Sequence, residues 1–156
     1  MSKYRNTELI DELIIHCAAT PNGKNFTIAD IDDWHKERGF QRSAAFVGVS
    51  DYTYKHVGYH IVIDLYGNIQ NGRKFDETGA HARGHNSRAI GICLIGTDKF
   101  TIEQWDTLKY FVESVLNRFP DIKIAGHNEI SNKICPGFNV QKWFKGGMKP
   151  AYNGVA

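Results

Sequence analysis

The sequence lacks long hydrophobic runs and any strong excess of one charge. No stretch approaches the roughly 20 apolar residues that cross a bilayer, so we expect no membrane-spanning segment. The 19 Lys and Arg residues nearly balance the 17 Asp and Glu residues, and a net charge of +2 gives no argument for a nucleic-acid partner. The first residues turn acidic at Glu8 and lack the basic segment and apolar core of a signal peptide. We therefore expect a protein that is cytoplasmic after synthesis, with no membrane or nucleic-acid partner.

Cysteine is scarce, and the three that are present do not suggest a disulfide framework, because their number is odd and no secretion signal precedes them. Cys17 and Cys93 lie in apolar runs, which is typical of small buried side chains. Cys135 differs, because it lies between Lys133 and the turn-forming pair Pro136 and Gly137. This cysteine calls for another explanation.

The chain of 156 residues is long enough for one domain with a sizeable core. We expect that domain to span residues 1–145 and to be followed by a loose, Gly-rich tail over residues 146–156. Apolar runs and alternation predict strands, and apolar residues at helical spacing between capping signals predict helices. The strands are expected at 13–17, 59–65, 69–71, 89–95 and 122–125, and the helices at 28–38, 102–119 and 140–144. Hairpin and crossover connections together favour an α/β fold of three layers, with a central mixed β-sheet flanked by helices.

Two histidines at the ends of expected strands, His16 and His127, together with Cys135 form a candidate metal site. Two imidazoles and a thiolate suit zinc, and three protein ligands leave a fourth position open, as in catalytic zinc sites. The pattern alone does not select this trio, because the sequence contains seven histidines and three cysteines.

Six segments, taken together and in order, resemble the amidase-2 family of N-acetylmuramoyl-L-alanine amidases, which includes T-odd phage lysozyme-type endolysins and is related to peptidoglycan recognition proteins. The resemblance covers residues 13–144. The segments are IHCAAT (15–20), WHKERGF (34–40), VGYHIVI (57–63), GAHARGHNS (79–87), IGICLIG (90–96) and GHNEI through KICPGF (126–138).

The resemblance implies one zinc ion per chain, held by His16, His127 and Cys135. It further implies that Tyr59 assists the attacking water and that Lys133 stabilises the oxyanion. The loop that contains His81 and Arg83 is expected to border the substrate cleft, where both residues are candidate substrate contacts. Asn128, beside a ligand, is a third candidate for substrate binding or for support of the metal site.

These expectations favour zinc-dependent hydrolysis of the amide between N-acetylmuramic acid and L-alanine in peptidoglycan, by a monomeric phage or prophage endolysin that acts on the cell wall after release. Two alternatives remain open: a cytoplasmic amidase that recycles muropeptides, and a peptidoglycan-binding or regulatory module. We do not expect a phage RNA polymerase as a partner, because the segment before Leu13 is short and has no recognisable match. Residues 41–57 form a longer connection than in compact phage relatives, and we expect it near the mouth of the cleft, where it would shape specificity for the stem peptide or glycan.

Overall fold

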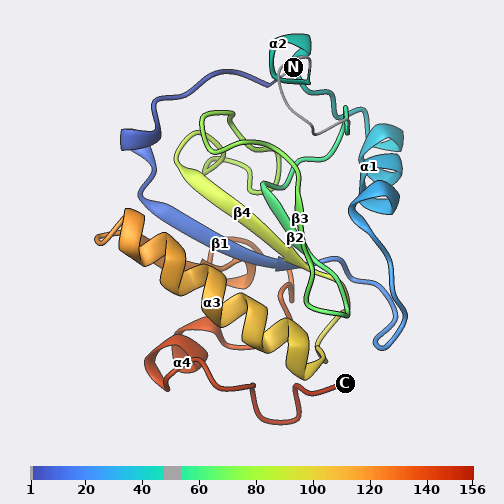
Figure 1. The fold of residues 1–156 in the computed structure, drawn as a ribbon, viewed down its shortest axis with the longest axis vertical. Helices are drawn as coiled ribbons and strands as arrows, with labels where there is room; N and C mark the ends of the chain where they lie inside the picture. Colours follow the sequence, from blue (N-terminus) through green and yellow to red (C-terminus); the bar gives the residue numbers. More distant parts are fainter. Residues whose placement is uncertain (1, 48–53) are drawn as a thin grey trace.

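A computed structural model describes residues 2–47 and 54–156 of the chain (Figure 1). Its strands form one five-stranded sheet in the order β3-β2-β4-β1-β5. Strands β2, β4, β1 and β5 are parallel to their neighbours, and β3 pairs with β2 in an antiparallel hairpin. The elements are η1 (Thr7–Leu9), β1 (Glu12–Cys17), α1 (Ile28–Glu37), α2 (Ala44–Val47), β2 (Ile61–Ile63), β3 (Ile69–Asn71), β4 (Ala89–Leu94), α3 (Ile102–Arg118), β5 (Lys123–Gly126), η2 (His127–Glu129) and α4 (Val140–Lys145).

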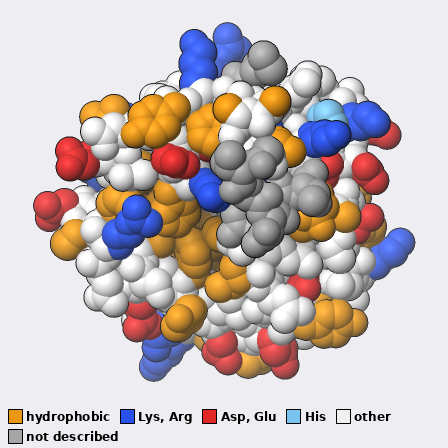
Figure 2. Space-filling model, turned by 45° about the horizontal axis from the view of Figure 1, so that its top comes forward, with side chains coloured by type: hydrophobic (Ala, Val, Ile, Leu, Met, Phe, Trp, Pro, Cys, Tyr) orange, Lys and Arg blue, Asp and Glu red, His pale blue; other side chains and the backbone are white. Residues whose placement is uncertain are grey.

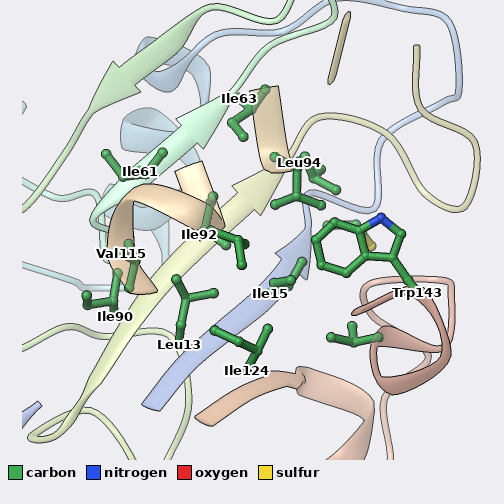
Figure 3. Packing of buried hydrophobic residues seen from close by; sticks show 14 of the residues in the cluster. Leu13, Ile15, Ile61, Ile63, Ile90, Ile92, Leu94, Val115, Ile124 and Trp143 are labelled. Atoms are coloured by element: carbon green, nitrogen blue, oxygen red, sulfur yellow. The ribbon is translucent and has the colours of Figure 1, made fainter. Parts of the chain in front are cut away.

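The mixed sheet flanked by helices confirms the predicted fold class. Alternate residues of the central strands point to opposite faces. One face, with Leu13 and Ile15 of β1 and Ile90 and Ile92 of β4, packs against the apolar stripe of α3 and against Trp143 of α4 (Figure 3). On the other face, apolar side chains of β2 and β4 pack against α1. The sheet is therefore the middle of three layers.

Side-chain caps explain where the main helices begin. The Thr27 N–H donates to the carboxylate of Asp30 over 2.8 Å at the start of α1. Thr101 and Gln104 exchange two hydrogen bonds at the start of α3, of 3.0 and 3.1 Å. Both pairs satisfy N–H groups that a helix start leaves without partners. Among the described residues, none of the helices combines the length and the apolar character that a membrane span needs.

Strand β2 is shorter than the sequence predicts, because only Ile61–Ile63 pair as a strand within the expected range 59–65. The alternating pattern continues on both sides of the strand. His60 still contacts the sheet, because its N–H donates to the Gly91 carbonyl of β4, whereas Asp64 accepts N–H groups of the turn that follows. Alternation therefore marks burial here beyond the limits of the strand itself.

The tail after Gly146 is packed against the domain, although its composition predicts a loose segment. The Gly154 carbonyl accepts the N–H of Phe100 over 2.8 Å and the indole N–H of Trp105 over 2.9 Å. Val155 forms a parallel bridge with Phe100, and Gly154 is buried. These bonds join residues about 50 positions apart in the sequence, which local composition cannot reveal.

Candidate metal centre and cleft

The two histidines of the predicted trio come from neighbouring parallel strands. His16 lies near the end of β1, and His127 follows directly after β5. The register pairs Ile15 with Gly126, so the next residue on each chain segment is a histidine at the same edge of the sheet. Their ring centroids lie 4.5 Å apart.

Cys135 reaches the same point from the loop after η2. Its Sγ atom accepts the N–H of Cys17 over 3.1 Å, which ties the loop to the end of β1. The ligand atoms of His16, His127 and Cys135 all lie within 4.8 Å of one another. The structure thus brings together the three residues that the sequence selected.

The electrostatic environment keeps both imidazoles neutral. Burial, followed by the neighbouring rings of His81 and His127 and by Lys133, holds the pKa of His16 well below its usual value. Burial and Lys133 also lower the pKa of His127. A neutral imidazole has a lone pair available for a metal, which a protonated one lacks.

The donor set fits a zinc ion. Two imidazole nitrogens and one sulfur converge on one point, and three protein ligands leave room for a fourth partner, as zinc chemistry requires. A hydrogen bond with the Cys17 thiol and burial raise the pKa of Cys135, so binding zinc would release the thiol proton. The described residues contain no second group of three candidate ligands with this geometry.

A cleft of about 700 Å³ opens above the trio. Tyr59 forms part of its wall, with its ring centroid 5.2 Å from that of His16. Burial raises the pKa of Tyr59 well above its usual value, so the phenol keeps its proton at neutral pH. Lys133 lines the cleft with an exposed side chain, and its charge contributes to the lowered pKa of both histidines.

The three predicted substrate contacts have different surroundings. Arg83 lines the cleft and is exposed. His81 also lines it, but its Nδ1 atom lies 2.9 Å from Nε2 of His16. Asn128 is not among the lining residues, and its amide donates to the Phe138 carbonyl over 3.3 Å. The structure therefore places Asn128 as a brace of the loop that carries Cys135.

Sequence reasoning missed three cleft residues at the end of α1: His35, Arg38 and Phe40. The Arg38 guanidinium lies 4.7 Å from the centre of the Phe40 ring, so an exposed cation is held over an aromatic face. His35 accepts the Gly58 N–H on its Nδ1 atom over 2.8 Å and packs against Tyr59. The sequence contained one signal for these residues, the glycine at position 39 that ends the helix. Residues next to the end of a helix can face a cleft.

The connection over residues 41–57 lies partly outside the described residues, which include neither Tyr52 nor the rest of 48–53. Among its described residues none lines the main cleft. Gln41 lines a smaller cavity of about 230 Å³, whose walls share Phe40 and Ala80 with the cleft. The start of the connection is thus next to the cleft. Its role in specificity stays a prediction.

Figure 2 shows Lys and Arg side chains interspersed with Asp and Glu on one face of the molecule. This agrees with the nearly balanced charge of the sequence. Among the residues that line the cleft, Arg38, Arg83 and Lys133 are the positively charged ones.

Comparison with known proteins identifies the family of this chain. The family described as N-acetylmuramoyl-L-alanine amidase (amidase-2) matches residues 5–138. The endolysin of Escherichia phage T7 is 30% identical over 151 residues, which cover 92% of this chain and 91% of that protein. The endolysin of Enterobacteria phage K11 is 30% identical over 153 residues, covering 93% and 92% of the two chains.

Solved structures share the fold. An endolysin amidase of Clostridium intestinale, LysCS, superposes with a TM-score of 0.72 at 25% identity, covering 94% of this chain and 90% of the other. Drosophila PGRP-LB superposes with the same TM-score at 24% identity, covering 92% and 84%, which supports the fold alone. The match over residues 5–138 and the endolysin relatives show that the chain belongs to the N-acetylmuramoyl-L-alanine amidase family.

Proposed function

We propose that this chain is a zinc-dependent endolysin that cleaves the amide between N-acetylmuramic acid and L-alanine in peptidoglycan. The observation that carries the proposal is the convergence of His16, His127 and Cys135 at a cleft that Tyr59 and Lys133 also line. Hydrolysis of an amide needs a polarised carbonyl, an activated water and a proton for the leaving nitrogen. The cleft contains a group suited to each need.

His16, His127 and Cys135 would hold the zinc ion. When bound, zinc supplies a Lewis acid that polarises an amide carbonyl and acidifies water. The neutral state of the two imidazoles prepares them for this task, because burial lowers the pKa of both. The Cys17 N–H, 3.1 Å from the Cys135 sulfur, would stabilise the thiolate.

Tyr59 and Lys133 supply the remaining chemistry in this proposal. The Tyr59 phenol stays protonated, so it can donate a hydrogen bond to the attacking water or pass a proton toward the leaving nitrogen. The Lys133 ammonium is free to approach the oxyanion of the tetrahedral intermediate because its side chain is exposed within the cleft. Loss of one such donor typically lowers the rate by about 10²–10³.

The substrate is proposed to be the stem peptide with its attached sugar. The cleft is large enough for several residues of a peptide, and Arg38 and Arg83 add two exposed cations to its lining. Stem peptides carry carboxylates, and a guanidinium pairs well with a carboxylate through two parallel hydrogen bonds. The two relatives described above, which match over nearly the whole chain, are phage endolysins, and this favours the intact cell wall over soluble fragments.

The test is an amidase assay on purified sacculi that measures release of free L-alanine amino termini. We expect chelation to abolish release, zinc to restore it, and Cys135→Ser to lack activity at all zinc concentrations. Lys133→Ala should lose about 10²–10³ in kcat, whereas the matched variant Lys142→Ala, an exposed lysine outside the cleft, should keep it. Full activity of both the chelated enzyme and Cys135→Ser would overturn the proposal.

A further inference from the structure

The ring of His81 is held against a proposed zinc ligand rather than presented freely to the cleft. Its Nδ1 atom lies 2.9 Å from Nε2 of His16, and the two rings meet edge to face at 88°. The main chain around it is fixed, because the side-chain oxygen of Asn86 accepts the N–H groups of both His81 and Ala82 over 2.9 Å. The loop therefore carries His81 to one defined position.

Two glycines provide the space that this ring fills. A Cβ atom at Gly91 of β4 would lie 2.4 Å from Cδ2 of His81, and one at Gly79 would lie 2.5 Å from the same atom. Any side chain at either position would collide with the imidazole. The ring is thus enclosed between the loop and the sheet, with its Nδ1 atom directed at His16.

The contact between the rings constrains where their protons lie. A neutral imidazole has one N–H donor and one lone-pair acceptor. If His16 gives a lone pair to zinc and is bonded to His81 through Nε2, then Nδ1 must be its zinc-binding atom. The proton of His16 is then on Nε2, and His81 must accept it on Nδ1. A hydrogen bond to the second nitrogen of a metal-binding histidine commonly fixes its tautomer and orientation.

We propose that His81 is a positioning residue that accepts the Nε2 proton of His16 and so presents Nδ1 of His16 to the zinc ion. This inference rests on the proposed function, because it assumes that His16 binds zinc. It replaces the prediction from sequence that His81 contacts the substrate. Once His16 uses the Nδ1 lone pair, the neutral His81 ring has no acceptor nitrogen left for a hydrogen-bond donor of the substrate.

The test compares two variants of nearly equal shape. His81→Asn keeps an acceptor oxygen near the place of Nδ1, whereas His81→Leu has a similar branched side chain without an acceptor. Zinc affinity is measured on the metal-free proteins by competition with a chromophoric chelator. The visible spectrum of the cobalt-substituted protein and NMR detection of the slowly exchanging Nε2 proton of His16 report on the ligand directly.

We expect His81→Leu to lose about 10–100-fold in zinc affinity, to change the cobalt spectrum and to lose the protected His16 proton. His81→Asn should restore most of the affinity and the spectrum. Wild-type zinc affinity and cobalt spectrum in His81→Leu, with a raised KM, would overturn the inference and favour substrate contact. Zinc binding by the wild type without dependence of activity on zinc would overturn the proposed function alone, since the affinity comparison would still test His81.

Discussion

A buried ion pair at the base of the 41–57 connection gives a sharp prediction about stability. The Arg42 guanidinium donates to the Glu77 carboxylate through Nε and Nη2, with distances of 2.8 to 3.2 Å, and Nη1 donates to the Tyr54 carbonyl over 2.7 Å. Both side chains are fully buried. The Arg42 N–H also donates to the Lys55 carbonyl over 2.7 Å, so this residue closes the connection at its base.

The predicted change is Arg42→Met, which keeps much of the apolar stem and removes the charge. It would leave the Glu77 carboxylate buried, with Arg73 as its remaining ion-pair partner at 3.8 Å. Breaking a buried pair by removing one partner costs about 3–5 kcal/mol. For a domain of this size each kcal/mol moves Tm by about 2–4 °C, so we expect Tm to fall by about 6–20 °C.

The assay is urea and thermal unfolding followed by circular dichroism. The control is Arg88→Met, because Arg88 is about half exposed and pairs with Asp11 and Glu12 at the surface. That variant should lose less than about 1 kcal/mol. The double variant Arg42→Met with Glu77→Leu should recover only part of the loss, since the buried Arg73 then loses its carboxylate partner. An Arg42→Met protein within 1 kcal/mol of the wild type would refute the reasoning.

Three further predictions follow from the site and the packing of the tail. Tyr59→Phe keeps the aromatic ring against His16 and removes only the hydroxyl group. We expect kcat to fall by about 10²–10⁴, while metal analysis finds an unchanged zinc content. An unchanged kcat would remove Tyr59 from the proposed mechanism. Burial lowers the pKa of His35 to about 4, whereas in the unfolded chain its pKa is near 6.5. Between these two values His35 is protonated in the unfolded chain and neutral in the folded protein, so acidification favours unfolding. The contribution of His35 to the free energy of unfolding is therefore fully present above about pH 6.5 and falls by about 3 kcal/mol on acidification to pH 4. Urea midpoints of the metal-free protein, measured across this pH range, would show the loss. The variant His35→Gln should weaken the pH dependence, and an unaltered pH profile in this variant would contradict the assignment. Deletion of residues 151–156 removes the Gly154 carbonyl that accepts the Phe100 N–H and the Trp105 indole N–H. Each donor left without a partner costs about 1–3 kcal/mol, so the free energy of unfolding should fall by several kcal/mol. Wild-type stability together with an unshifted Trp fluorescence spectrum would show that the tail contributes little.

The main elements could be predicted from sequence because their signals are local. The stripe of α3, its Thr101 cap and the apolar runs of β1 and β4 all depend on residues within a few positions of one another. Strand β2 was overestimated because alternation reports burial, whereas a strand also needs a paired partner. The tail was misjudged because its glycines indicate freedom, while its hydrogen bonds reach Phe100 and Trp105.

The candidate site likewise combines residues that the sequence could identify with contacts that only the structure reveals. Family resemblance selected His16, His127 and Cys135, and the structure brings their ligand atoms within 4.8 Å. It could not assign His81, whose hydrogen bond to His16 joins residues 65 positions apart. Nor could it show that Arg42 and Glu77, 35 positions apart, form a buried pair.

The sequence by itself therefore determined the type of fold, the order of its elements and the identity of the candidate ligands. Periodicity, caps and motif segments each depend on residues that are close together in the sequence. Only the tertiary structure decided which atoms are in contact. Its contributions are the enclosure of His81 by Gly79 and Gly91, the buried ion pair of Arg42 with Glu77 and the packing of the C-terminal tail against Phe100. Each of these depends on the register of parallel strands and on loops from distant parts of the chain. Contacts of that kind become fixed when the sheet assembles, since local patterns leave open which loop will face which strand.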